Sequence, residues 1–148
     1  MKEYTLITGA SSGIGYEMAK QLASKNYNLL LVARSEDKLL KLQQELKKQF
    51  NIEVEYLLYD LSEPNSAQDL YKQVQERKYM VTGLINNAGF GLNQKFVGGD
   101  LQAEQQMLDV CMLAGWYHAI SFAANAARVP FEFGAPRFAD YLQTTKVI

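Results

Sequence analysis

The stretch TGASSGIG, residues 8–15, determines how this chain is expected to fold. It follows a short apolar run at residues 4–8 and leads into a segment where Ile14, Met18 and Leu22 recur at four-residue steps. The first pattern predicts a β-strand, and the second predicts one face of a helix that begins at the second glycine. A glycine-rich turn between a strand and a helix is either a binding site for an anion or an ordinary flexible turn.

The first hundred residues continue this alternation of strands and helices. Further strands are predicted at residues 29–32, 54–59 and 80–86, and further helices at 36–50 and 66–78. Residues 29–32, Leu-Leu-Leu-Val, are apolar throughout, as expected of a strand that is covered on both faces of a parallel sheet. The alternation implies right-handed crossovers and a doubly wound α/β fold.

The second helix carries its own start signals. Ser35 is expected to act as its N-cap, and Glu36 and Asp37 suit the positive end of the helix dipole. Four apolar residues then mark the side that should be buried: Leu39, Leu42, Leu46 and Phe50.

Each glycine of the first turn has a predicted role. Gly9 permits the tight turn, Gly13 lets the backbone approach a pyrophosphate, and Gly15 lets helix and strand pack closely. The phosphates would lie at the helix N-terminus, where N–H groups and the dipole favour an anion. The turn is not a Walker loop, because no Gly-Lys-Ser/Thr follows.

The end of the second strand, Val32-Ala33-Arg34, bears on which dinucleotide is bound. An NAD-selecting fold places a carboxylate near this point to hold the ribose 2′-hydroxyl, whereas this chain has Ala33 followed by Arg34. A guanidinium can hold a 2′-phosphate through charge-assisted hydrogen bonds worth roughly 1.5–3 kcal/mol. We therefore predict NADP(H) in preference to NAD(H). The alternative is that Arg34 is a solvated residue ahead of the helix cap.

Two later motifs complete the predicted site. Asp60 and Leu61 follow the third strand, where the carboxylate could accept a hydrogen bond from an adenine amino group while Leu61 covers the ring; Asp60 could equally be a turn residue. The fourth strand ends in Asn-Asn-Ala-Gly, residues 86–89. Its small residues leave space for a cofactor, and an Asn amide can link neighbouring strands.

These four motifs, in this order, resemble those of the classical short-chain dehydrogenase/reductase family over residues 1 to about 114. The resemblance implies an incomplete Rossmann sheet of about four strands in the order 3-2-1-4 with a helical C-terminal segment. It also implies hydride transfer between a nicotinamide and a carbonyl or alcohol. The residues expected to bind the cofactor are Gly9, Ser11, Ser12, Gly13, Ile14, Gly15, Arg34, Asp60, Leu61, Asn87, Ala88 and Gly89. Ser12 stands where many NADP-dependent members have a second basic residue.

The chain departs from the family where the catalytic residues are expected. Cys111 occupies the position of an Asn of the catalytic tetrad, and a thiol cannot replace the hydrogen bonds of an amide. Ser121, Tyr141 and Lys146 follow in the family's order, but Tyr141 and Lys146 are five residues apart and would lie on different faces of a helix. His118 is expected on a helix surface. We assign no catalytic residue.

Composition changes at the same place. Residues 1–100 contain 24 charged side chains and residues 101–148 contain 7, while alanines rise from 6 to 9. We therefore expect an NADP-binding Rossmann-type domain at residues 1–114 and a divergent helical or irregular tail at 115–148 that is not a separate domain. The tail is interpreted as an out-of-frame read, a deletion junction or an unrelated extension of a truncated chain, or as ordinary divergence toward a helical cap.

Overall composition excludes several other classes of protein. A net charge of −1 over 148 residues gives no excess of positive charge for binding nucleic acid or an anionic membrane surface. No apolar run is long enough to span a bilayer. The single cysteine, Cys111, excludes a disulfide framework and zinc-finger spacing, so we expect no metal site and a cytoplasmic location.

Three functional classes remain open at this point: an NADP(H)-dependent oxidoreductase, a binding module that holds the dinucleotide without chemistry, and a non-functional fragment. The resemblance alone does not make this chain an active enzyme, because the usual Ser and Tyr-xxx-Lys are not recognisable in it. We also expect self-association, either through the exposed edge of the fourth strand or through an apolar helix at residues 101–127.

Overall fold

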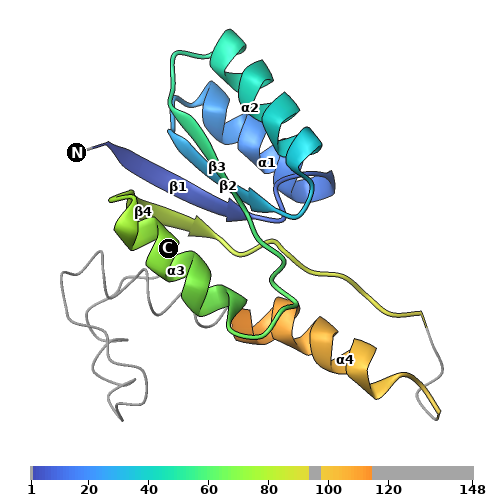
Figure 1. Ribbon diagram of the computed structural model, residues 1–148. Helices are drawn as coiled ribbons and strands as arrows, with labels where there is room; N and C mark the ends of the chain where they lie inside the picture. The colour runs from blue at the N-terminus through green and yellow to red at the C-terminus, as the bar shows by residue number, and fades with distance from the viewer. Residues whose placement is uncertain (1, 94–97, 115–148) are drawn as a thin grey trace, which may run out of the picture.

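The computed structural model describes residues 2–93 and 98–114 of the chain. In chain order the elements are β1 (Glu3–Thr8), α1 (Gly13–Ser24), β2 (Leu29–Ala33), α2 (Glu36–Gln49), β3 (Val54–Leu58), α3 (Ser66–Glu76), β4 (Met80–Ile85), α4 (Leu101–Leu108) and the π-helical turn η1 (Asp109–Ala114). Figure 1 shows this alternation of strands and helices along the chain. Each strand and helix predicted in the first hundred residues is confirmed, with ends that differ by one or two residues.

The four strands form one parallel sheet in the order β3-β2-β1-β4, which confirms the predicted fold class and strand order. One rung runs across all four strands: Ile7 of β1 pairs with Leu31 of β2 and with Ile85 of β4, and Leu31 pairs with Tyr56 of β3. Because all four strands are parallel, their carboxyl ends meet at one edge of the sheet, where such folds bind ligands.

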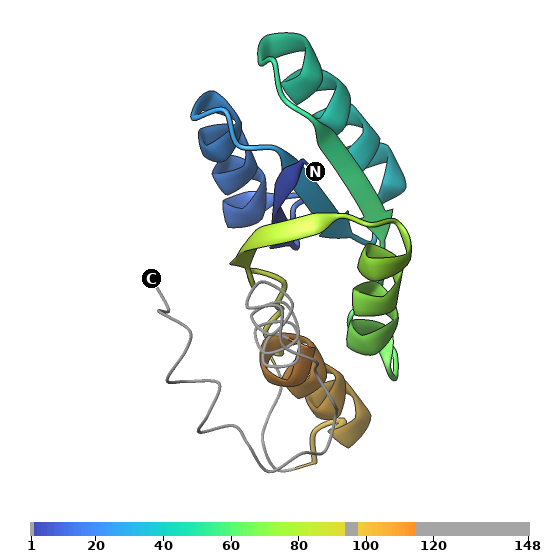
Figure 2. The same ribbon diagram turned by 90° about the vertical axis from the view of Figure 1, so that its left-hand side faces the viewer.

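Helices cover both faces of the sheet. Figure 2 shows α1 and α2 on one side of the sheet and α3 and α4 on the other. The two faces correspond to two separate apolar cores. Alternate residues of β2 enter them in turn, with Leu29 and Leu31 in the core under α1 and α2, and Leu30 and Val32 in the core under α3. This alternation confirms that β2 is buried on both sides.

The predicted apolar face of α1 is buried only at its C-terminal end, where Leu22 is partly buried against the core under α1 and α2. Ile14 is 71% exposed and Met18 is 38% exposed, whereas the buried residues of the helix are Gly15, Ala19 and Ala23. At Gly15 the reason is close approach, because a Cβ atom there would lie 2.4 Å from the carbonyl oxygen of Gly9 in the turn after β1. Spacing alone identified the helix but not the residues that it buries most deeply.

The predicted start of α2 is only partly correct. Ser35 is the N-cap residue, as expected, but its side chain makes no capping hydrogen bond. The predicted apolar side is confirmed for Leu39, Leu42 and Leu46, which are fully or almost fully buried. Phe50 is the C-cap residue beyond the last turn, and it is partly buried against the same core.

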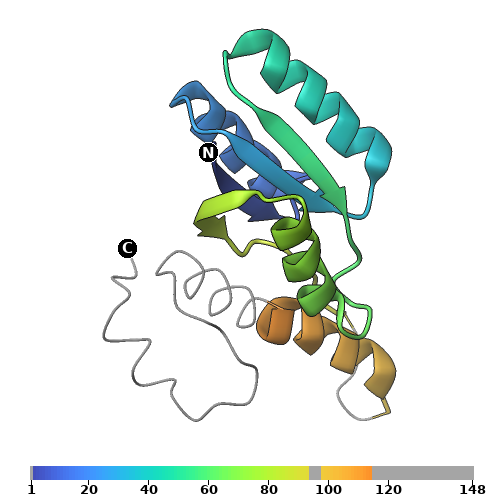
Figure 3. The same ribbon diagram turned by 60° about the vertical axis from the view of Figure 1, so that its left-hand side comes forward.

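The helix predicted at residues 101–127 is described only as far as residue 114. There it consists of α4, which has no buried residue, and η1, from which Val110 reaches the core under α3. Figure 3 shows α4 on the same side of the sheet as α3 but farther from the strands. The tail expected at residues 115–148 lies outside the described residues. Among the helices that are described, none is both long and apolar enough to cross a membrane.

Candidate functional site

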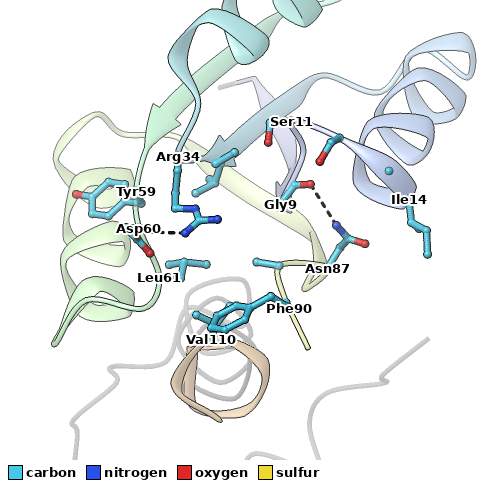
Figure 4. A pocket seen from close by; sticks show the side chains of 16 residues that line it. Gly9, Ser11, Ile14, Arg34, Tyr59, Asp60, Leu61, Asn87, Phe90 and Val110 are labelled. Carbon is cyan, nitrogen blue, oxygen red and sulfur yellow. Dashed lines mark hydrogen bonds and ion pairs between the residues drawn. The ribbon is translucent and has the colours of Figure 1, made fainter. Parts of the chain in front are cut away.

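A pocket of about 400 Å³ lies at the carboxyl ends of β1, β2 and β4. Every residue predicted to bind the cofactor lines it, except Gly15, which packs behind the turn. Segments from four different parts of the chain therefore meet at one place, as Figure 4 shows for the labelled residues.

Five further residues line the pocket that sequence reasoning did not select: Val32, Ala33, Tyr59, Phe90 and Val110. The first four lie within two positions of predicted residues and could have been included from position alone. Val110 comes from η1, about twenty residues beyond the last motif, and only the resemblance, which places the adjacent Cys111 at a catalytic position, indicated this part of the chain.

The first turn requires its glycines for different reasons. Gly9 and Gly13 have positive φ angles of 67° and 58°, which side chains other than glycine rarely adopt. A Cβ atom at Gly13 would meet no atom within 4 Å, so the space in front of this residue is open. A Cβ atom at Gly15 would lie 2.4 Å from the carbonyl oxygen of Gly9 and 2.5 Å from Nδ2 of Asn87. Gly15 therefore allows the close packing that its spacing predicts.

Asn87 ties the end of β4 to the end of β1. Its Nδ2 group donates to the carbonyl oxygens of Thr8 and Gly9, at 3.1 and 3.3 Å. In return, the Thr8 hydroxyl oxygen accepts from the backbone N–H groups of Asn87 and Ala88, both at 3.0 Å. This confirms the prediction that an Asn amide links neighbouring strands, and it fixes the turn against the fourth strand.

The N-terminus of α1 is suited to an anion. Its N-cap residue, Ser12, makes no side-chain capping bond, and its first turn contains no acidic residue. The other described α-helices have acidic residues there: Glu36 and Asp37 in α2, Asp69 in α3 and Glu104 in α4. The positive end of the α1 dipole therefore faces the pocket without a carboxylate of its own.

Arg34 and Asp60 face each other across one side of the pocket (Figure 4). The Nη1 atom of Arg34 lies 3.6 Å from Oδ2 of Asp60. Burial by itself would raise the pKa of the Asp60 carboxyl, but two hydrogen bonds from Ser62 and the charge of Arg34 outweigh it and hold the pKa below its usual value. Asp60 is therefore ionised at neutral pH.

The opposite wall is formed by Phe90 and Val110, which Figure 4 shows side by side. Cys111, next to Val110, is exposed, and its thiol donates to the carbonyl oxygen of Phe90 at 3.6 Å. A Cβ atom added to Gly89 would lie 3.2 Å from the Cys111 sulfur. The residue that stands in place of the expected Asn is thus directly beside the Asn-Asn-Ala-Gly segment. Among the residues that the structure describes, no cluster of three or more His, Cys, Asp or Glu residues could hold a metal ion.

A family model described as short chain dehydrogenase matches residues 3–126. The chain belongs to the short-chain dehydrogenase family. The match extends twelve residues beyond residue 114, the point to which the motifs alone carried the resemblance.

Members of the short-chain dehydrogenase family in several organisms are similar to this chain. A very-long-chain 3-oxoacyl-CoA reductase of Vanderwaltozyma polyspora is 42% identical over 88 residues, which are 58% of this chain and 25% of that protein. A solved short-chain dehydrogenase from Sphingobium yanoikuyae in complex with NADPH has 30% identity and a TM-score of 0.77, covering 86% of this chain and 50% of that one. An alcohol dehydrogenase from Thermococcus sibiricus complexed with 5-hydroxy-NADP has 34% identity and a TM-score of 0.77, with 86% and 55% covered. The chain thus spans about a quarter to about half of the length of these relatives.

The residues considered for catalysis are not tested by this geometry. His118, Ser121, Tyr141 and Lys146 all lie outside the described residues. Ser121 falls within the span that the family model matches, whereas Tyr141 and Lys146 fall beyond it. Cys111 is the one member of that set whose surroundings the structure describes, and it is 3.6 Å from a backbone carbonyl oxygen.

Proposed function

We propose that this chain binds NADP(H) in preference to NAD(H) in the pocket at the carboxyl ends of β1, β2 and β4. The observation that carries the proposal is the position of Arg34. It lies at the end of β2, in the same pocket as the open space before Gly13 and the acid-free N-terminus of α1. Two solved family members that share this fold contain NADPH and 5-hydroxy-NADP.

The residues of the pocket fit the parts of such a dinucleotide. Phosphates would lie on the first turn of α1, where the positive φ of Gly13 and the absence of a nearby side chain let the backbone N–H groups approach them. Asp60 and Leu61 would contact the adenine, and Asn87, Ala88 and Gly89 would line the middle of the cofactor. Ser11, Ser12 and Ile14, which also line the pocket, would lie beside the phosphates and the adenosine ribose.

Arg34 is the group that would distinguish the two cofactors. Its side chain is 68% exposed, so it can reach a phosphate at the mouth of the pocket without a change in the fold. A charge-assisted bond to phosphate contributes roughly 1.5–3 kcal/mol, on the order of ten- to a hundredfold in affinity. With Ser12 in place of a second basic residue, we expect a preference toward the lower end of that range.

A bound nicotinamide would supply hydride transfer to or from a small carbonyl or alcohol, the reaction of the family. The part that this chain's own residues would play is binding and orientation. Losing a positioned acid or base typically costs 10²–10⁴ in rate, and the Ser and Tyr-xxx-Lys pattern that would supply such groups is not recognisable in the sequence. We therefore propose that the 148-residue chain binds the cofactor but reduces carbonyl substrates slowly or not at all.

The experiment is a fluorescence titration of the full chain with NADPH and with NADH. We expect tighter binding of NADPH by about tenfold, and we expect Arg34→Gln to remove most of that difference while leaving NADH binding unchanged. Arg77→Gln is the matched control, because it removes the same charge from an exposed residue that lines a different groove, beside β3 and α3. Equal binding of the two cofactors by the wild type would refute the preference for NADP(H).

Two further parts of the proposal concern the protein in its cell. A cytoplasmic location is supported by the single cysteine, which suits a reducing compartment. Self-association through the edge of β4 is supported by the pairing of that strand, since in the described sheet β4 pairs with β1 on one side only.

A further inference from the structure

Both carboxylate oxygens of Asp60 already have partners within the chain. Its Oδ1 atom accepts two hydrogen bonds from Ser62, one from the backbone N–H at 3.0 Å and one from the hydroxyl at 2.6 Å. Its other oxygen, Oδ2, lies 3.6 Å from Nη1 of Arg34. One side of the carboxylate is thus clamped to the turn after β3, and the other side is aimed at the guanidinium.

The two members of this ion pair differ in freedom. The Asp60 side chain is 37% exposed and bound to its own turn, whereas the Arg34 side chain is 68% exposed. Among the residues that line the pocket, Arg34 and Asp60 are the two that carry a formal charge, so their charges cancel within the lining. The positive charge that would attract a phosphate is therefore already balanced from within the chain.

We propose that Asp60 is the internal counter-ion of Arg34, and that a 2′-phosphate binds by taking the guanidinium over from this carboxylate. The inference rests on the proposed binding of NADP(H) and deepens it. Asp60 is then a positioning residue that limits how strongly the pocket prefers a phosphorylated ribose, in addition to any contact that it makes with adenine.

The strengths of the two interactions favour transfer of Arg34 from Asp60 to a 2′-phosphate. An exposed ion pair shifts an equilibrium by about fivefold or less, because water and salt screen it. Charge-assisted bonds from a guanidinium to phosphate contribute on the order of ten- to a hundredfold. The Arg34 guanidinium therefore binds a 2′-phosphate more strongly than it binds the Asp60 carboxylate. The phosphate must still break the Arg34–Asp60 ion pair, and it then remains near the negative charge of Asp60. Without that carboxylate, we expect the preference for the phosphate to rise by about threefold.

The test compares two ligands that differ only in the 2′-phosphate: adenosine 2′,5′-bisphosphate and adenosine 5′-monophosphate. Their dissociation constants are measured by calorimetry for the full chain and for Asp60→Asn, which keeps an oxygen acceptor for Ser62 but removes the charge that holds Arg34. We expect the ratio of the two constants to rise by about threefold in favour of the bisphosphate. A loss of adenine contact or a general loosening of the fold would change both constants alike and leave the ratio unmoved.

Control variants separate this effect from net charge. Asp69→Asn removes the same charge from α3, where Asp69 pairs with Lys72 at 3.7 Å, and it should leave the ratio unchanged. Combining Asp60→Asn with Arg34→Gln should reduce the threefold rise, because the carboxylate acts mainly through Arg34. If Asp60→Asn fails to fold, Ser62→Ala is the second variant. It removes the hydroxyl bond to Oδ1 and keeps the backbone N–H bond, so the carboxylate is held less firmly opposite Arg34, and the ratio should rise by a smaller factor.

The outcomes distinguish this inference from the proposed function. A wild type that binds both ligands equally contradicts the preference for NADP(H). A ratio that then rises in Asp60→Asn, and rises less when Arg34→Gln is added, still supports the counter-ion. A wild type with an Arg34-dependent preference that Asp60→Asn leaves unchanged or lowers overturns the counter-ion and leaves the proposed function standing. Failure of every variant and the wild type to bind either ligand overturns both.

Discussion

The strands β2 and β4 are similar in sequence and differ in surroundings. Both are short apolar segments, Leu-Leu-Leu-Val-Ala and Met-Val-Thr-Gly-Leu-Ile. All five residues of β2 are buried between β1 and β3, whereas β4 has one buried residue, Val81, and one exposed residue, Thr82, and pairs with β1 alone in the described sheet. The edge position of β4 in the described sheet and its Thr82 and Gly83 both reduce what this strand contributes to the core.

The pocket joins these two unequal regions. The end of β2 supplies Arg34 from a rigid, fully buried strand, and the end of β4 supplies Asn87 from a half-buried one. Between them, Thr8 and Gly9 hold Asn87 through the hydrogen bonds at the end of β1. The adenosine side of the site is thus formed at the end of the better packed strand. The middle of the site is held by the hydrogen bonds between Asn87 and the end of β1.

Truncating a core leucine in each strand should separate the two regions most clearly. Leu30 of β2 is fully buried, and Leu84 of β4 is only partly buried against the same core. We expect Leu30→Ala to lower the free energy of unfolding by about 3–5 kcal/mol and Leu84→Ala by about 1 kcal/mol. Urea unfolding monitored by circular dichroism measures both. Equal losses would show that β4 is as well packed as β2.

The close packing of the turn after β1 against Asn87 can be tested at Gly15. A Cβ atom there would lie 2.4 Å from the carbonyl oxygen of Gly9 and 2.5 Å from Nδ2 of Asn87, so Gly15→Ala must move the turn away from β4. We expect a loss of about 2 kcal/mol in the free energy of unfolding. Gly91→Ala is the control, because a Cβ atom there meets nothing within 4 Å, and it should change stability by less than about 0.5 kcal/mol. A Gly15→Ala chain as stable as Gly91→Ala would contradict the close packing.

The exposed edge of β4 gives the smallest expected effect. If copies of the chain associate through this edge, the sedimentation coefficient of the wild type should rise with concentration, and Thr82→Lys should weaken the rise, because an edge lysine opposes strand pairing. Gln44→Lys adds the same charge to an exposed position of α2 and serves as the control. A wild type that sediments as a monomer at every concentration would remove this part of the proposal.

The sequence was sufficient for the features that depend on local pattern. The alternation of strands and helices predicted the sheet, and the Asn-Asn-Ala-Gly segment predicted the link that Nδ2 of Asn87 makes to Thr8. It failed where tertiary packing overrides spacing. Ile14 and Met18 belong to the apolar stripe and are exposed, whereas the buried residues of α1 are the small ones beside them: Gly15, Ala19 and Ala23.

Long-range contacts were predicted only in part. Val110 lines the pocket from η1, and only the resemblance, which places the adjacent Cys111 at a catalytic position, indicated this part of the chain. The predicted strand order 3-2-1-4 already placed the ends of β2 and β3 side by side, but the ion pair that Arg34 and Asp60 form there was not predicted. Each residue was selected for a contact with the cofactor, and their contact with each other came from the fold.

The central claim is that the pocket at the carboxyl ends of the strands binds the dinucleotide. It is tested most directly by titrating isotopically labelled protein with NADP⁺ and mapping the backbone amide shifts by nuclear magnetic resonance. We predict saturable shifts at Gly9, Gly13, Arg34, Asp60 and Ala88, and none in the groove beside β3 and α3, which is lined by Leu58, Gln73 and Arg77. Shifts confined to that groove, or no shifts at millimolar NADP⁺, would contradict the account.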